Sequence, residues 1–405
     1  MVTAEFNPFT PQALADPYPM YRELLKHNPV SWSPVMEVWI YTRYEDVDAI
    51  LTRPGMSADR RTGNNRFAQM QREQMERDRT SPFNRAPTML TTDPPDHTRL
   101  RRLVSKAFTP RAVEDLRPRI QDIVNFLLGE AADAGEMDLV QALGYPLPVI
   151  VIAEMLGIPP EDRAKFKKWS DEIVATLGGP FTPQSVLDQA AVSISELVQY
   201  LSEVIADRRK NPRDDLISGL VMAEDEGNVL TEEEIYSTTM LLLIAGNETT
   251  THLIDNGMLA LLKNPEQAEL LRKDPGLIRP AVEELLRYIG PVQMTGRVIK
   301  EDMELGGQQV KAGQSAMAVL GAGNHDPAKW GEDAHLLDIT RNPVDHLAFG
   351  DGIHFCLGAP LARAEAQIAI ATLLERFPKL KLAAEEPEWG GTFIIRGVKS
   401  LPLRF

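Results

Sequence analysis

The chain has 405 residues, of which 43% are hydrophobic, so it is long enough to bury a large core. Its 43 basic and 58 acidic residues give a net charge of -15, which argues against nucleic acid and anionic membranes as main partners. The single cysteine excludes an internal disulfide, the N-terminus lacks a signal-peptide pattern, and no apolar run approaches the roughly 20 residues that span a bilayer, so we expect a cytoplasmic protein.

The N-terminal quarter mixes predicted helices, a hairpin and a long irregular segment. A helix is expected from Asp16 to about 27, a hairpin over 30–33 and 38–42, and a further helix from Tyr44. Residues 54–96 have no clear periodicity, and a long irregular segment inside a compact domain is usually functional or mobile.

The middle of the chain is predicted to be almost entirely helical. Proline, aspartate or threonine starts followed by early acidic residues, as in "PPEDRAKF" and "TEEEIYST", are typical of helix N-termini. The expected helices span roughly 100–112, 113–133, 146–156, 160–177, 183–210, 213–225, 231–263, 265–273 and 277–288.

The last third returns to mixed structure, with short strands over 290–320, a helix over 357–378 and a closing hairpin. The predicted fold class is therefore mainly α with minor β. We expect a single domain over residues 1–405, whose β-rich parts lie near 28–43, 290–320 and 380–405.

Cys356 lies in "FGDGIHFCLG", residues 349–358, and has three possible roles. It could be a small buried hydrophobe, a nucleophile with His354 as its base, or a thiolate ligand to a metal or haem. Three glycines surround it, and Pro360 suits the first turn of a helix that begins just after it. A helix N-terminus stabilises a thiolate, which favours the ligand role.

This segment resembles the cysteine-ligand loop of the cytochrome P450 haem-thiolate monooxygenases, F-G-x-G-x-H-x-C-x-G, at every fixed position from Phe349 to Gly358. The resemblance covers nearly the whole chain. It implies that Cys356 is the proximal iron ligand of a haem b and that His354 binds a propionate. It also implies the family's fold, with the haem between the long central helix and the helix that follows the cysteine.

The predicted central helix carries "LLLIAGNETTTH", residues 241–252, which resembles the family's oxygen-activation motif. Ala245 and Gly246 would leave a flat helix surface against the haem. Glu248 and Thr249 pair an acid with an alcohol, a combination that suits proton delivery to bound oxygen. Thr250 and Thr251 offer further hydroxyls, so the register among the three threonines stays open.

Further residues match the family's haem-binding and structural positions. His97, Arg101 and Arg297 match its propionate-binding residues. "EELLR" with Glu284 and Arg287 resembles its E-x-x-R helix, in which a later arginine, here Arg341, completes a buried clamp. The basic residues Arg99, Arg102 and Lys106 follow His97 on the same predicted helix and could bind an acidic electron donor, although a solvated helix face is a comparable interpretation.

The resemblance implies a monooxygenase that inserts one oxygen atom from dioxygen into a lipophilic small molecule such as a terpenoid, steroid, fatty acid or macrolide. Electrons would come from a ferredoxin or flavodoxin with its NAD(P)H reductase, and we expect a monomer that binds neither nucleic acid nor membrane. A peroxide-using haem-thiolate peroxygenase and a haem-free cysteine hydrolase are the alternatives. The residues expected to line the substrate pocket are Phe83, Met89, Leu90, Leu242, Ala245, Val292, Met294, Phe393 and Ile394.

Overall fold

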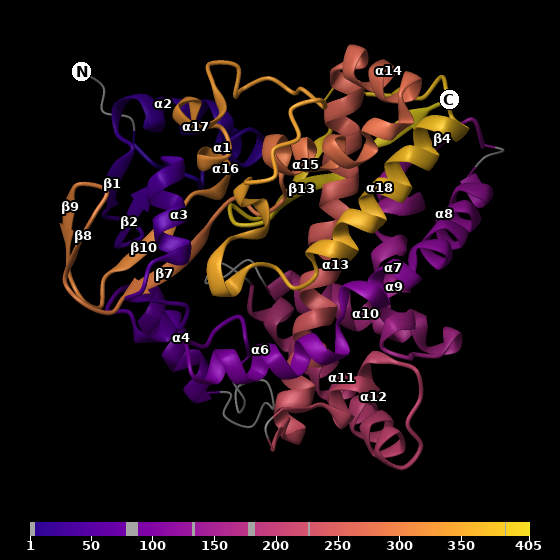
Figure 1. Ribbon diagram of the computed structural model, residues 1–405, viewed down its shortest axis with the longest axis horizontal. Coiled ribbons are helices and arrows are strands. Elements are labelled where there is room, and N and C mark those ends of the chain that lie inside the picture. Colours follow the sequence, from indigo (N-terminus) through magenta and orange to yellow (C-terminus); the bar gives the residue numbers. More distant parts are fainter. Residues whose placement is uncertain (1–4, 78–87, 132–133, 177–182, 226, 385) are drawn as a thin grey trace. The chain divides into compact units, whose positions relative to one another are not determined.

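The computed structural model describes residues 5–77, 88–131, 134–176, 183–225, 227–384 and 386–405. The chain folds into two compact units (Figure 1). Unit 1 holds residues 1–66, 117–147 and 249–405, and unit 2 holds residues 67–116 and 148–248. The long helix α13, Glu232–Lys263, contributes residues to both units.

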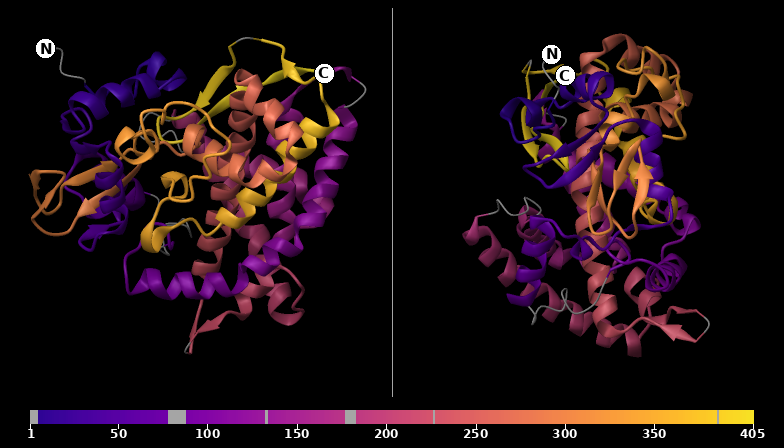
Figure 2. Two further views of the ribbon diagram at one scale, coloured as in Figure 1. Left: turned by 45° about the horizontal axis from the view of Figure 1, so that its top comes forward. Right: turned by 90° about the vertical axis from the view of Figure 1, so that its left-hand side faces the viewer.

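Unit 1 is built on a five-stranded sheet in the order β1-β2-β10-β7-β3. Strand β10 pairs in parallel with β2 and antiparallel with β7, so segments almost 300 residues apart share one sheet. Helix α3 packs on the sheet through Val47 and Ile50, which join Tyr41, Ile299 and Leu320 in one buried core cluster. Figure 2 shows the β8–β9 hairpin projecting beside this sheet.

The helices and strands of unit 1 have the following bounds: α1 Pro11–Ala15, α2 Tyr18–His27, β1 Val30–Ser33, β2 Val38–Tyr41, α3 Tyr44–Thr52, β3 Met56–Ser57, α8 Arg117–Ala131, β4 Glu136–Asp138, α14 Pro265–Lys273, α15 Ile278–Ile289, β7 Thr295–Ile299, β8 Met303–Leu305, β9 Gln308–Val310, β10 Ser315–Ala318, α16 Leu320–Gly323, α17 Pro327–Trp330, α18 Ala359–Arg376, β11 Lys381–Leu382, β12 Glu388–Gly391, β13 Arg396–Ser400 and β14 Pro402–Arg404. Short helical turns include the π-helix η3, Val140–Gly144, and the 3-10 helices η7, Leu347–Phe349, and η8, Gly352–His354.

The secondary structure in the described part of unit 2 is helical apart from the short strands β5 and β6. Helices α10 and α11 pack together through an aromatic cluster of Phe166, Trp169 and Tyr200, whose ring centroids lie 5.6 to 5.8 Å apart. The elements are α4 Arg66–Arg77, α6 Asp96–Ala107, α7 Pro110–Asp115, α9 Pro146–Met155, α10 Arg163–Val174, α11 Gln184–Lys210, α12 Leu216–Met222, β5 Glu224–Asp225, β6 Asn228–Val229 and the first half of α13.

The structure confirms the mainly helical fold with minor β structure. Strands occur in all three regions where they were predicted, and α14 has the predicted bounds, 265–273. The hairpin over 30–41 and the helix from Tyr44 are also confirmed. Within the described ranges, no helix combines the length and the hydropathy needed to cross a bilayer. The single domain over 1–405 stays a prediction.

Three local predictions were wrong. Residues 66–77 form helix α4 and not an irregular segment, because the stretch contains no proline and is rich in glutamine, arginine, methionine and glutamate, which favour helix. The predicted helix 100–112 ends at Ala107, and Pro110 starts a separate helix whose N-cap Thr109 accepts a hydrogen bond from the Ala112 amide. Strand β4 was missed, because it exists only through pairing with the distant strand β14.

Candidate active site

The cysteine loop joins η7 to α18 and holds Cys356 at the helix N-terminus. The Cys356 amide donates a hydrogen bond to the Phe349 carbonyl oxygen at 2.9 Å, which closes the loop. Helix α18 begins three residues after Cys356, with Pro360 in its first turn. The thiol is exposed, whereas cysteine is among the residues most often buried. Its place at a helix N-terminus stabilises a thiolate.

Two glycines give this loop its backbone conformation, and one of them also allows a close approach to α3. Gly350 and Gly352 both have positive φ, +69° and +66°, a conformation that residues with a side chain rarely adopt. A Cβ at Gly352 would also lie 2.9 Å from the Leu51 carbonyl oxygen, so only glycine allows α3 and the loop to approach this closely.

The surroundings of the thiol have room for a flat group. At Gly358 an added Cβ would find the Cys356 Sγ as its nearest neighbour, 3.9 Å away, and at Gly350 it would find only the His354 carbonyl oxygen, also at 3.9 Å, among the described residues. An exposed thiol bordered by open backbone fits an iron ligand beneath a macrocycle better than a packed hydrophobe.

Unit 1 also holds two of the predicted propionate-binding residues. Arg297 lies on β7, is 8% exposed, and donates hydrogen bonds to the Gly296 carbonyl and the Thr295 hydroxyl at 3.0 and 3.4 Å. His354 ends the 3-10 helix η8, two residues before Cys356. The sheet therefore fixes the arginine, and the cysteine loop fixes the histidine.

Unit 2 holds the other predicted pair, His97 and Arg101, one turn apart on α6. His97 is 3% exposed. Burial lowers the pKa of His97, and the neighbouring Arg101 lowers it further. A neutral imidazole of this kind can still donate one hydrogen bond to an anionic group.

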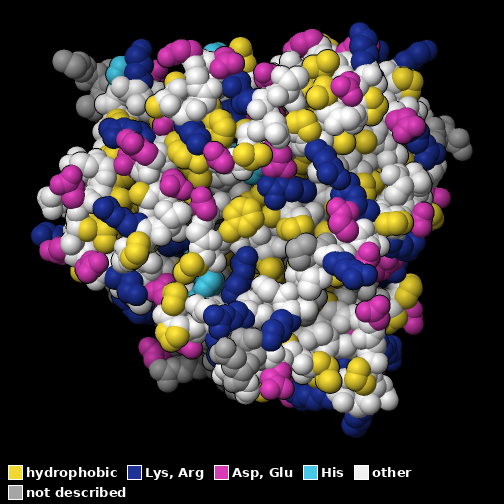
Figure 3. All heavy atoms as spheres, viewed as in Figure 1, with side chains coloured by type: hydrophobic (Ala, Val, Ile, Leu, Met, Phe, Trp, Pro, Cys, Tyr) yellow, Lys and Arg dark blue, Asp and Glu magenta, His cyan; other side chains and the backbone are white. Residues whose placement is uncertain are grey.

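The basic face predicted on α6 is partly neutralised. Arg99 forms an ion pair with Glu234 in which the contact to Oε2 is 3.2 Å, and Lys106 donates to the Glu224 carbonyl oxygen. Arg102 is exposed. Figure 3 shows Lys and Arg side chains over the position of α6. The charge that this helix presents is thus smaller than its sequence suggests.

Helix α13 carries the predicted oxygen-activation motif without interruption. Ala245 and Thr249 lie one turn apart on the helix; Ala245 is exposed and Thr249 is half-buried. A Cβ at Gly246 would meet no described atom within 4 Å, so the helix surface there is open. Glu248 is half-buried, whereas Thr250 and Thr251 are each 3% exposed. Of the three threonines, Thr249 is therefore the most accessible.

The predicted pocket residues differ in their surroundings, and Phe83 lies outside the described residues. In unit 2, Met89 and Leu242 are buried and Leu90 is 54% exposed. In unit 1, the Gln293 amide donates to the Ile394 carbonyl at 2.8 Å, so the segment with Val292 and Met294 lies beside the C-terminal hairpin with Phe393 and Ile394.

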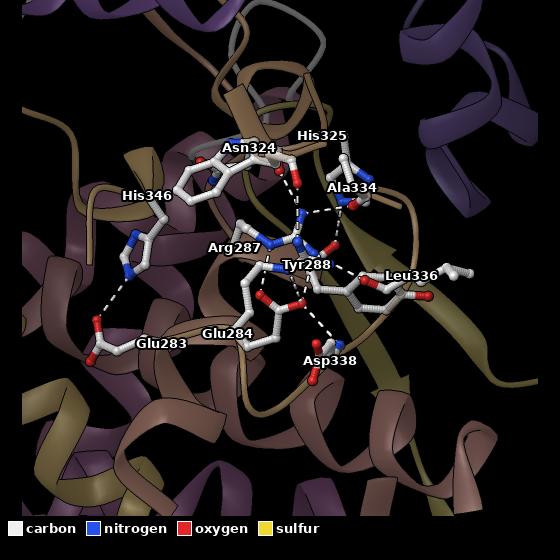
Figure 4. Close-up of polar contacts among 12 residues, drawn as sticks. Glu283, Glu284, Arg287, Tyr288, Asn324, His325, Ala334, Leu336, Asp338 and His346 are labelled. Carbon is white, nitrogen blue, oxygen red and sulfur yellow. Dashed lines mark hydrogen bonds and ion pairs between the residues drawn. The ribbon is translucent and has the colours of Figure 1, made fainter. Parts of the chain in front are cut away.

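The predicted clamp is present in unit 1 (Figure 4). Arg287 and Glu284 are almost completely buried, and two hydrogen bonds of 2.7 Å join them. The remaining N–H groups of Arg287 donate to the carbonyls of Asn324, Ala334 and Leu336 at 2.7 to 3.1 Å, so all five of its donors are used. Arg341 adds a contact of 3.4 Å to Glu284.

A second polar group in unit 1 was missed by the sequence reasoning. Beside the clamp, Glu283 contacts both His346 and Arg363. The contacts join positions 63 and 80 residues apart, and no local pattern reveals such pairs. The adjacent glutamates of "EELLR" were the only visible signal.

Comparison with known proteins supplies the family. The family model described as "Cytochrome P450" matches residues 26–275 and 276–389. The curated relative "Cytochrome P450 CYP107DY1" of Priestia megaterium is 43% identical, with 98% of each chain covered. The "Vitamin D(3) 25-hydroxylase" of Pseudonocardia autotrophica is 39% identical, with 99% of this chain and 96% of the relative covered.

A solved structure agrees over the same length. CYP109E1 from Bacillus megaterium, in complex with testosterone, matches with a TM-score of 0.84 and 37% identity, covering 98% of this chain and 99% of that one. The family model and the structural comparison thus identify the same family over nearly all 405 residues. The chain belongs to the cytochrome P450 family, and it is a cytochrome P450 monooxygenase whose cofactor is haem.

Proposed function

We propose that Cys356 is the proximal ligand of the haem iron and that the enzyme inserts one oxygen atom into a lipophilic small molecule. The observation that carries this proposal is the exposed thiol at the N-terminus of α18, bordered by open glycine backbone. When bound, the haem supplies the activation of dioxygen, in which one oxygen atom enters a C–H bond and the other leaves as water with two electrons and two protons.

Four cationic or hydrogen-bonding side chains would hold the two propionates. In this proposal His97 and Arg101 act from α6, and Arg297 and His354 act from unit 1. Phe349 and Gly358 shape the two ends of the cysteine loop, and Ala245 with Gly246 leaves a flat helix surface for the macrocycle. The low exposure of His97 and Arg297 supports this role, because hydrogen bonds from donors shielded from water bind a carboxylate more strongly than those from exposed donors.

Glu248 and Thr249 would manage the protons. The Thr249 hydroxyl can donate a hydrogen bond toward the site of oxygen binding, and the half-buried Glu248 can exchange protons with water. Thr250 and Thr251 are buried and less suited to this task. The acid–alcohol pair also supports a dioxygen-using enzyme over a peroxygenase, which does not need it. A haem-free hydrolase does not agree with membership of this family.

The substrate is proposed to be of steroid size and lipophilic. Support comes from the apolar residues expected to line the pocket, Leu242, Val292, Met294, Phe393 and Ile394, and from relatives. One of these is named a vitamin D(3) hydroxylase, and another holds testosterone in its crystal structure. Terpenoids, fatty acids and macrolides belong to the same lipophilic class.

The electrons would come from a ferredoxin or flavodoxin and its NAD(P)H reductase. The 405 residues contain one cysteine, so they hold too few thiolates for an iron–sulfur cluster, and they show no Gly-rich βαβ signature. Arg102 and Lys106 are the exposed residues of the basic face proposed on α6, whereas Arg99 is already paired with Glu234.

The ferrous carbon monoxide spectrum of the purified haem protein tests the ligand. The wild-type protein should show the strongly red-shifted Soret band of a thiolate ligand, and Cys356→Ala should lose it. Glu375→Gln, an exposed change on the same helix, serves as a control and should keep the band. A wild-type spectrum without this band would contradict the proposal. Titration with testosterone, followed by the ferric spin-state change, then tests the substrate class.

A further inference from the structure

A polar network of three side chains joins α15, α18 and the segment before the cysteine loop. The proposed function assigns no task to these side chains. Arg363 donates from Nε and Nη2 to the two carboxylate oxygens of Glu283 at 2.7 and 2.8 Å. The Nε2 atom of His346 lies 3.1 Å from Glu283 Oε2 (Figure 4). The side chains of His346 and Glu283 are 1% and 13% exposed. All three residues belong to unit 1.

The contacts of His346 fix its tautomer. The Ala348 amide donates to His346 Nδ1 at 3.2 Å, which requires a lone pair on that nitrogen. The hydrogen of the neutral ring is therefore on Nε2 and is donated to Glu283. By accepting from Ala348, His346 caps the 3-10 helix η7, Leu347–Phe349, that leads into the cysteine loop.

Both ends of the network meet at Phe349. His346 caps the short helix whose last residue is Phe349, and the rings of these two residues lie 5.7 Å apart. The Arg363 guanidinium lies 4.6 Å from the centroid of the Phe349 ring, a cation–π distance. The Phe349 carbonyl in turn accepts the hydrogen bond from the Cys356 amide. A continuous chain of contacts thus runs from Glu283 to the cysteine.

The network is also a balanced pair of charges. Burial alone would raise the pKa of Glu283, but hydrogen bonds from His346 and Arg363 outweigh it and bring the pKa to about 2. Glu283 is therefore an anion that compensates the cation of Arg363, which lies about one turn into α18. In this half-buried setting, removing either charge leaves the other exerting its field on the cysteine loop with little screening.

We propose that Glu283, His346 and Arg363 are positioning residues that hold Phe349 and the Cys356 loop, and that the balance between Glu283 and Arg363 sets the reduction potential of the haem. This inference rests on the proposed ligand role of Cys356 and is independent of the substrate. It predicts shifts of opposite sign when the two charges are removed one at a time, which a purely structural role would not produce.

The test is the ferric/ferrous potential of the haem-loaded protein in Glu283→Gln and Arg363→Gln. Loss of the anion leaves Arg363 uncompensated, stabilises the more negative ferrous state and raises the potential. Loss of the cation lowers it. We expect each change to alter the equilibrium constant for reduction at least about threefold, or about 28 mV, since tenfold is about 59 mV for one electron. The double variant should return toward the wild-type potential.

Matched controls are Glu375→Gln and Arg376→Gln, the same chemical changes at exposed positions of α18, and they should leave the potential unchanged. Shifts of the same sign in the two test variants, or shifts no larger than those of the controls, would overturn the proposal. If the single variants do not retain haem, the charge-balanced double variant decides. A double variant that also loses haem would show a structural role only and would overturn the proposal.

The outcome is distinguishable from a failure of the ligand assignment. If Cys356 is not the ligand, the wild-type protein already lacks the red-shifted ferrous carbon monoxide band. If the wild-type protein shows that band and the variant potentials do not move as described, the ligand assignment stands and only the network proposal fails.

Discussion

Asp255 gives a prediction that can be worked through from the structure. Its carboxylate is 0% exposed, and neither oxygen has a hydrogen-bond partner in the described part of the chain. It lies on α13 against Gly144, where even an added Cβ would come within 2.3 Å of Asp255 Oδ1. Burial raises the pKa of Asp255 well above its usual value, and the charge of Asp138 raises it further. The folded protein therefore keeps a proton here up to a higher pH than the unfolded chain does.

This difference has a definite sign. The folded-state pKa is raised, so the contribution of Asp255 to stability is fully present below the unfolded pKa of about 3.9 and is lost as the pH rises toward the folded pKa. Because one proton is retained on folding, the free energy of unfolding falls by at most about 1.4 kcal/mol per pH unit in that window. Asp255→Asn, which is nearly isosteric and does not titrate, should remove this slope.

The assay is the melting temperature of the haem-loaded wild-type protein and of Asp255→Asn between about pH 5 and pH 8. We expect the variant to gain stability relative to the wild type as the pH rises above the unfolded pKa of Asp255, until the pH reaches the folded pKa. Asp214→Asn, an exposed change, is the control and should track the wild type. A difference between Asp255→Asn and the wild type that does not change with pH would refute the reasoning.

Three further predictions concern the clamp, the loop and proton delivery. Arg287→Lys can make at most three of the five clamp hydrogen bonds, so we expect a loss of about 3–5 kcal/mol, seen as a lower melting temperature and loss of haem; an unchanged melting temperature would contradict it. Gly352→Ala should lower the melting temperature more than Gly227→Ala, because both have positive φ but only Gly352 faces a backbone oxygen at 2.9 Å, and equal effects would argue against the close approach. Thr249→Ala should use more NAD(P)H per product than the wild type, and unchanged coupling would count against its role in proton delivery.

The sequence predicted the parts of the fold that local patterns encode. Helix α14 begins at Pro265 and ends at Lys273, which are the bounds predicted from the sequence. Strand β4 could not be predicted, because Glu136–Asp138 becomes a strand only beside residues 402–404. Helix α4 was missed because its polar residues hid a helix-favouring composition.

In the site, too, local sequence patterns were predictable and contacts between distant segments were not. The cysteine loop was readable because its glycines, histidine and cysteine lie within ten residues and match a specific motif. The clamp was predicted through family resemblance, and its five hydrogen bonds came from the structure. The network around Glu283 depends on contacts between segments more than 60 residues apart, so its existence follows only from the tertiary fold.

The saturated guanidinium of Arg287 has a consequence for local opening of the chain. Residues 331–346 contain no helix or strand, yet the carbonyls of Ala334 and Leu336 and the Asp338 amide are bound by the buried pair on α15. This segment cannot detach without leaving buried charge unsolvated. It therefore belongs to the same cooperative unit as α15, and the Asp338 amide hydrogen, which Glu284 accepts, should exchange with solvent as slowly as those of a helix.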